Sequence, residues 1–176
     1  MIYRLNDFYY VRTLLEADLD GSYPLWFEDQ EVCLHNSHGK FFKTRSQLSE
    51  FVMNANRQDR IVWAICHVED GHVGNIALEN LSFVNRDADL GVLIGDKRHW
   101  GRGVASEAAK KILYHGFNKL NLRRIHCQAA ESNRAMLSVA RKLGMIEEGR
   151  RRQAVYVNGG WQDIIEFGIL LDEFIG

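Results

Sequence analysis

The segment most suited to binding a charged ligand is GDKRHWGRGVASEAAKKIL, residues 95–113. Gly101 and Gly103 stand directly before a helical pattern that begins near Gly103 or Val104. The first N–H groups of a helix have no partner within it, and the helix dipole adds partial positive charge there. Glycines let a bulky anion approach such groups closely. The segment therefore predicts a diphosphate cradle, although a turn with a solvated basic surface would show the same spacing.

Cationic side chains around these glycines can add charge-assisted contacts to an anion. They are Lys97, Arg98 and Arg102. The alternative phosphate-binding patterns do not fit, because G-x-x-x-x-G-K-[ST] is absent and residues 95–103 do not match G-x-G-x-x-G.

RHWGRGVA, residues 98–105, matches the R/Q-x-x-G-x-G/A signature of the Gcn5-related N-acetyltransferases, the GNAT superfamily, which bind acetyl-CoA. The likeness continues through "NLRRIHCQAAESNRAMLSVARKLGMIEEG" to the final hairpin. It resembles the branch that contains ribosomal-protein alanine N-acetyltransferases and spermidine N-acetyltransferases. The resemblance is clear over about residues 60–171 and loose over residues 1–55.

The resemblance implies that acetyl-CoA is the cosubstrate and that no metal is needed. Its acetyl-pantetheine arm would lie along a strand that splays from its neighbour, and its diphosphate would rest on the loop backbone. The residues implied for the arm and the diphosphate are Val92, Leu93, Ile94, Arg98, His99, Trp100, Gly101, Arg102, Gly103, Val104 and Ala105, with Asn133 near the pantetheine.

The resemblance also implies direct attack of a neutral amine on the thioester, with a nearby group accepting the amine proton. Asp89 is the matching carboxylate, where the family commonly has Glu, and Glu79 on the adjacent strand is a second candidate. The position at which many relatives have a Tyr general acid is Ala140 here. Ser138 is close in sequence but differs in helical phase. A thiolate of pKa about 8.5 needs little protonation help.

The amine acceptor is expected to bind between the segment 20–55 and the final hairpin. His35 and His38, in CLHNSHGKFF, are candidates for binding it, and two ordinary surface histidines are the alternative. Nothing in the sequence pairs the remaining histidines as metal ligands. The leading acceptor is a small molecule, an amino-sugar nucleotide or a polyamine. The alternatives are the N-terminal α-amine of a (ribosomal) protein, and an acyl-CoA sensor without turnover.

Predicted elements that position these residues alternate between strands and helices. Strands are expected at 60–68, 73–78, 88–95 and 123–129, a helix from 103 or 104 onward, another over 132–143, and a hairpin across Asn158-Gly159. A further helix follows a possible Ser46 cap. The order predicts an α/β (α+β) fold, with helices on both faces of a mixed, twisted sheet. The family resemblance implies a mostly antiparallel sheet of about seven strands.

Composition places the chain among ordinary globular proteins. It has 176 residues, a net charge of −1 and three widely spaced cysteines. We expect one domain over residues 1–176 in the reducing cytoplasm. Neither a nucleic acid nor a membrane is an expected partner, since the charge is balanced and no stretch approaches the ~20 apolar residues of a membrane helix. A homodimer is plausible on family grounds.

Overall fold

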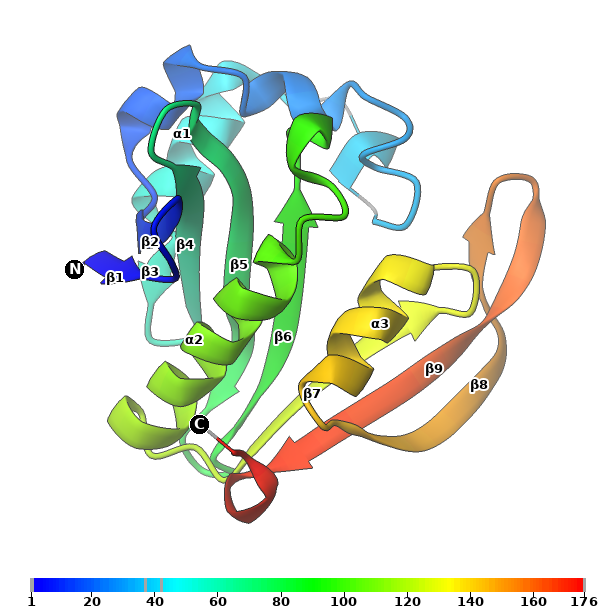
Figure 1. Cartoon of the computed structure of the whole chain (residues 1–176). Coiled ribbons are helices and arrows are strands. Elements are labelled where there is room, and N and C mark those ends of the chain that lie inside the picture. Colours follow the sequence, from blue (N-terminus) through cyan, green and yellow to red (C-terminus); the bar gives the residue numbers. More distant parts are fainter. Residues whose placement is uncertain (1, 37, 42, 176) are drawn as a thin grey trace.

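The computed structural model describes residues 2–36, 38–41 and 43–175 (Figure 1). Its strands are β1 (Ile2–Arg4), β2 (Tyr9–Thr13), β3 (Asn56–Arg57), β4 (Arg60–His67), β5 (Gly71–Ser82), β6 (Asp87–Ile94), β7 (Arg124–Ala130), β8 (Ile146–Val157) and β9 (Gly160–Leu170). The described residues form one nine-stranded sheet of order β1-β2-β4-β5-β6-β7-β9-β8, with β3 paired to β4. All pairs are antiparallel except β6 and β7. The mixed, mostly antiparallel sheet is confirmed. The predicted number of strands was too low, because short pieces such as β1 and β3 carry no periodic pattern.

Helices cover both faces of the sheet, as predicted. They are α1 (Arg45–Met53), α2 (Val104–Lys119) and α3 (Arg134–Lys142). Alternation along β4 separates two cores. Trp63 and Ile65 join the larger core, under α2 and α3, whereas Val62 and Ala64 join a second core under α1. Each large apolar side chain buried in this way stabilises the fold by about 1.5–3 kcal/mol.

The cap of α1 differs from the prediction. Thr44, not Ser46, is the N-cap: its hydroxyl accepts a hydrogen bond from the Gln47 N–H, at 3.2 Å. The Gln47 side-chain oxygen accepts in turn from the Thr44 N–H, at 2.9 Å. This reciprocal capping box satisfies two N–H groups and places Ser46 inside the helix.

β6 and β7 separate soon after they meet. Asp87–Asp89 pair with Arg124–His126, and the parallel pairing ends there. β6 nevertheless stays paired with β5 as far as Ile94. Above Asp89, therefore, one edge of β6 has no strand beside it in the described part of the chain, and Figure 1 shows the two strands diverging toward α3. The predicted splay is confirmed, and it leaves backbone hydrogen-bonding groups at the opening.

Two further features bear on the setting of the protein. Among the described residues, no helix has the length and apolar character to cross a membrane. Cys33, Cys66 and Cys127 are buried free thiols.

Candidate active site

A large cavity fills the opening beside β6. Its volume is about 610 Å³, and it extends from β6 to the start of α2 and the first turns of α3. It brings together most of the residues that the sequence analysis assigned to acetyl-CoA: Val92, Leu93, Ile94, His99, Trp100, Gly101, Gly103, Val104, Ala105 and Asn133. Asn133 also caps α3, since its side-chain oxygen accepts from the Met136 N–H at 3.1 Å.

The backbone at the start of α2 has the form of an anion cradle. Gly101 and Gly103 have φ angles of 72° and 81°, which favour glycine. No atom lies within 4 Å of the position that a Cβ would take at either glycine. Gly103 is the N-cap of α2 and supplies no capping side chain. The Trp100 indole N–H holds the loop against β6 by donating to the Ile94 carbonyl at 2.8 Å. The cradle therefore fits the diphosphate of acetyl-CoA.

The loop cations are placed differently from the cradle glycines. Lys97 lies 2.7 Å from Asp29 and 2.9 Å from Glu31, which raise its pKa. Arg98 pairs with Asp96 at 2.6 Å and with Asp70 at 2.9 Å. Their charges are thus already balanced by carboxylates.

Neither Arg98 nor Arg102 lines the cavity. Arg102 is exposed and forms no ion pair within the described ranges, so it is the loop cation left for a phosphate. The N–H groups of the loop and of α2 must supply most of the attraction for an anion.

A second cavity, of about 180 Å³, lies on the α1 side of β6. Aromatic, aliphatic and amide side chains line most of it: Tyr23, Phe27, Asn36, Leu48, Phe51, Val62, Asn75, Ala77, Val92 and Leu93, together with Lys43, Glu79 and Gly91. Gly91, Val92, Leu93 and Asn36 also line the larger cavity, so the two meet at β6. At Gly91, open space occupies the position of a Cβ. An amine in the smaller cavity can therefore reach a group held along β6.

The two candidate carboxylates are cross-strand partners with different surroundings. Glu79 lines the smaller cavity, and its Cα pairs with that of Asp89 in the β5–β6 register. Asp89 lines neither cavity. Its two oxygens are engaged: Oδ1 lies 2.8 Å from His126 Nδ1, and Oδ2 accepts from the Asn80 amide at 2.7 Å.

The contact between Asp89 and His126 shifts their pKa values in opposite directions. The hydrogen bond from His126, aided by the one from Asn80, lowers the pKa of Asp89. The same bond raises the pKa of His126. A carboxylate whose pKa is lowered and whose oxygens are occupied is a weak base. His126 was missed by sequence reasoning, because only the parallel register places it opposite Asp89.

Neither of the two α3 positions considered from the sequence offers an acid to the thiol leaving group. Ala140 is buried, and Ser138 is exposed and lines neither cavity. The residues that α3 does present to the larger cavity include Met136 and Val139. The structure therefore does not bring Ser138 to the site, in keeping with its different helical phase.

Of the two histidines proposed for the acceptor, the structure places the side chain of His35 alone. His35 lines the larger cavity, and burial lowers its pKa. Its Nδ1 is buried and makes no hydrogen bond. The side chain of His38 lies outside the part of the chain that the structure describes. Lys43, Phe51 and Asn75, which the sequence analysis did not select, line the acceptor-side cavity instead.

Comparison with known proteins decides the family. The model of the acetyltransferase (GNAT) domain matches residues 10–146. The chain belongs to the GNAT family. A putative ribosomal N-acetyltransferase of Bacillus subtilis is 36% identical over 58% of this chain and 56% of its own length. The spermidine N(1)-acetyltransferase of Vibrio cholerae is 27% identical over 61% of this chain and 64% of its own length. These matches span less than two thirds of either relative.

Solved structures extend the likeness of this GNAT chain to nearly its whole length. The crystal structure of a probable acetyltransferase has a TM-score of 0.83 at 26% identity, and covers 99% of both chains. The Vibrio cholerae spermidine N-acetyltransferase in complex with CoA and spermine has a TM-score of 0.84 at 20% identity, and covers 96% of this chain and 98% of its own. At 20% identity the second likeness bears on the fold alone.

Proposed function

We propose that this protein transfers the acetyl group of acetyl-CoA to a primary amine. The observation that carries the proposal is the junction at β6, where an opened strand edge and a glycine cradle meet a smaller cavity lined by Glu79. Acetyl-CoA would supply an activated acetyl group as a thioester. Gly101, Gly103 and the start of α2 would hold its diphosphate, and the free edge of residues 90–94 would align its arm and orient the reacting carbonyl.

We propose Glu79 as the group that takes the proton from the incoming ammonium, directly or through one water. It lines the acceptor cavity, whereas Asp89 is held by His126 and Asn80. This order reverses the ranking suggested by sequence. In the proposal Asp89 and His126 position the two strands where they part. No side chain is assigned to the thiolate, which leaves readily near neutral pH.

The charges around the acceptor cavity favour an amine on an anionic carrier. The Lys43 ammonium lies 5.8 Å from the Phe27 ring centroid and 6.0 Å from that of Phe51. The Arg60 guanidinium lies 5.8 Å from the Phe51 ring. The cations of Lys43 and Arg60 thus lie beside the rings of Phe27 and Phe51, which line the cavity. An amino-sugar nucleotide, with an amine at one end and phosphates at the other, matches this arrangement.

A polyamine matches it less well. The segment WFEDQE, residues 26–31, has acidic side chains of the kind that bind a polycation. Two of them, Asp29 and Glu31, are already paired with Lys97. A protein N-terminus remains the second candidate, because a relative 36% identical to this chain is named a putative ribosomal N-acetyltransferase. An acidic segment after that N-terminus would suit the same cations.

The test is release of the CoA thiol from acetyl-CoA in the presence of amino-sugar nucleotides, spermidine, or peptides with free N-termini and acidic or neutral sequences. Turnover with amino-sugar nucleotides is expected, and Glu79→Gln should lower kcat at least tenfold while CoA binding is kept. Turnover with spermidine alone would contradict the acceptor assignment. CoA binding with no turnover of any amine would favour the sensor alternative.

The domain count, the cellular location and the oligomeric state are still predictions from sequence. We expect the chain to act as one domain in the cytoplasm, where its three free cysteines would stay reduced. A homodimer remains a prediction that sedimentation of the purified chain can check.

A further inference from the structure

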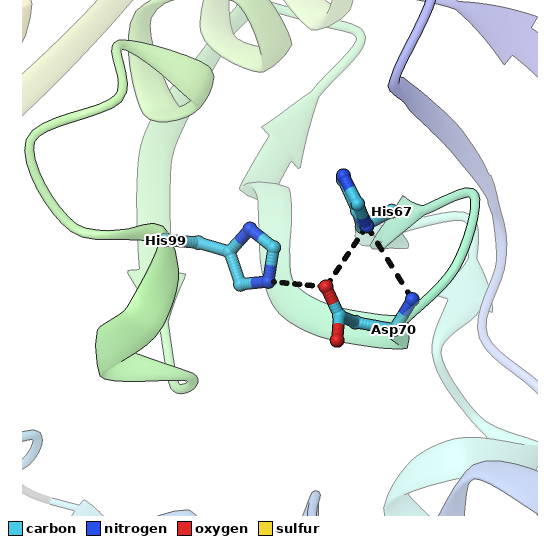
Figure 2. Close-up of side chains that lie close together, drawn as sticks. All are labelled: His67, Asp70 and His99. Carbon is cyan, nitrogen blue, oxygen red and sulfur yellow. Dashed lines mark hydrogen bonds and ion pairs between the residues drawn. The ribbon is translucent and has the colours of Figure 1, made fainter.

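A compact cluster of two histidines and one aspartate lies beside the cradle loop (Figure 2). His67 ends β4, Asp70 lies in the turn to β5, and His99 belongs to the short 3-10 helix η4 (Lys97–His99). His67 Nδ1 is 2.9 Å from Asp70 Oδ2, and His99 Nε2 is 3.3 Å from the same oxygen. The three donor atoms all lie within 4.8 Å of one another. This pairing could not be predicted from sequence patterns, because two distant segments supply the histidines.

His99 presents a buried nitrogen without a hydrogen bond to this cluster. Its side chain is 2% exposed. On one side of the ring, Nδ1 lies 2.7 Å from the Tyr9 hydroxyl. On the other side, Nε2 makes no hydrogen bond, although it faces Asp70. A buried polar atom left in this way costs free energy unless a ligand engages it.

His67 shows a second mismatch. Its Nδ1 accepts backbone N–H contacts from Glu69 and Asp70, each at 3.4 Å. The same nitrogen lies 2.9 Å from the Asp70 carboxylate oxygen. One imidazole nitrogen cannot both accept from N–H groups and donate to a carboxylate, so one set of these contacts is left unsatisfied. A cation between Nδ1 and the carboxylate would be bound by a lone pair of each.

The surrounding charges leave one carboxylate oxygen for such a cation. Arg98 takes Asp70 Oδ1 at 2.9 Å, and it also pairs with Asp96 at 2.6 Å. Asp70 Oδ2 faces the two imidazoles, and Asp96 Oδ2 lies 3.9 Å from His99 Nε2. Arg102 also acts electrostatically on His99, so the two carboxylates face two guanidiniums. Arg98 leaves Asp70 Oδ2 unpaired, and that oxygen is the one open to a positive ion. The Asp70 side chain is 27% exposed and provides an entry path.

We propose that His67, Asp70 and His99 bind a divalent transition-metal ion, with Zn²⁺ the ion that best fits. Two imidazole nitrogens and one carboxylate oxygen are a common donor set for zinc, with water completing the tetrahedron. Bonds of about 2.0–2.1 Å place tetrahedral ligands roughly 3.3 Å apart. The Asp70 oxygen lies at 2.9 Å and 3.3 Å from the two histidine nitrogens, close to that value. The Tyr9 hydroxyl supplies the outer hydrogen bond that orients a ligating histidine.

The position of this site gives the ion a structural role. It would join the β4–β5 turn to η4, and the cradle residue Gly101 follows η4 by two residues. The ion would thus stiffen the loop that receives the diphosphate. His99 also lines the larger cavity, whereas His67 and Asp70 line neither cavity. The proposal does not depend on which amine is acetylated.

The test uses the full chain without a polyhistidine tag, stripped of metal and titrated with Zn²⁺ or Co²⁺. Calorimetry should give one ion per chain, and Co²⁺ should give the visible absorption of a tetrahedral site. Asp70→Asn and His67→Gln remove ligands. Changes outside a metal's ligand shell already weaken binding roughly 10- to 100-fold, so each variant should lose at least that much affinity.

Glu69→Gln is the matched control, because it removes one carboxylate from the exposed neighbour of Asp70 and leaves all three ligands. It should bind zinc like the original chain. Zinc should also raise the melting temperature of the original chain and of this control, but not of Asp70→Asn. Absence of stoichiometric binding to the original chain would overturn the proposal. Binding that is unchanged in a folded Asp70→Asn chain, as judged by circular dichroism, would also overturn it.

Discussion

The two cavities that meet at β6 are built from different parts of the polypeptide. The cofactor side relies on backbone: a free strand edge, two glycines with positive φ and the start of α2. The acceptor side relies on side chains, many of them from the irregular segment before α1 and from α1 itself. A backbone site can keep its ligand while side chains change. A side-chain site changes its ligand when one residue changes, so under the proposed function the acceptor side would set which amine reacts.

The largest effect is expected from a negative charge introduced on the cofactor side, which is built from backbone. Gly103→Glu should lower the affinity for CoA by about 100-fold or more, since like charges set against each other cost several kcal/mol. Isothermal titration with CoA measures the effect. Gly103→Ala is the control, because it carries the backbone strain of a φ of 81° without the charge. Equal losses in the two variants would place the effect in the backbone conformation and not in the diphosphate.

A change at the junction should affect turnover and spare binding. Gly91 lines both cavities, and its Cβ position is open space. Gly91→Val should therefore fold normally and insert a branched side chain between amine and acetyl group. Displacing reacting groups by about 1 Å costs roughly 100-fold in rate, so we expect a fall in kcat of that order. A variant that keeps full kcat would show that the amine does not pass Gly91.

A change on the acceptor side should alter the choice of amine only. Lys43→Glu reverses an exposed charge beside Phe27 and Phe51. Exposed charge contacts contribute about 0.2–1 kcal/mol each, so reversal should raise KM for an anionic acceptor by up to about tenfold. The affinity for CoA should not change. A lower KM for the anionic acceptor would contradict the proposed role of the cations.

The smallest effect concerns the Asp89–His126 pair, which links β6 to β7 where the two strands part. The lowered pKa of Asp89 adds stability above its ordinary value, and that stability is lost as pH falls through the lowered pKa. The raised pKa of His126 adds stability below its ordinary value, and that stability is lost as pH rises through the raised pKa. Asp89→Asn should therefore destabilise the chain most between about pH 4 and 6.5, by less than about 1 kcal/mol.

Urea unfolding over a range of pH measures this difference. Asp172→Asn is the matched control, because Asp172 pairs with Arg123 at 2.9 Å and an arginine keeps its charge at high pH. The control should show no decline of the effect above neutral pH. A flat profile for Asp89→Asn would mean that the ion pair contributes nothing to folding.

The contrast between a site built from backbone and one built from side chains explains which features could be predicted from the sequence. β6, α2 and the cradle were predictable, because alternation, helical periodicity and the spacing of Gly101 and Gly103 are local patterns. Glu79 was named as the weaker candidate, since its cavity becomes visible only once the loops are placed. Lys43 and Asn75 carry no local signal at all. His126 and His99 acquire their partners through strand order and turns, which single-sequence periodicity does not determine.

The short parallel contact between β6 and β7 has a geometric consequence. Among the described residues, strand pairing joins the two halves of the sheet at residues 87–89 and 124–126 alone. The gap between β6 and β7 therefore widens with distance from this contact, toward the C-terminal end of β6 (Figure 1). A ligand arm that enters from the far end would meet the widest part of the gap first.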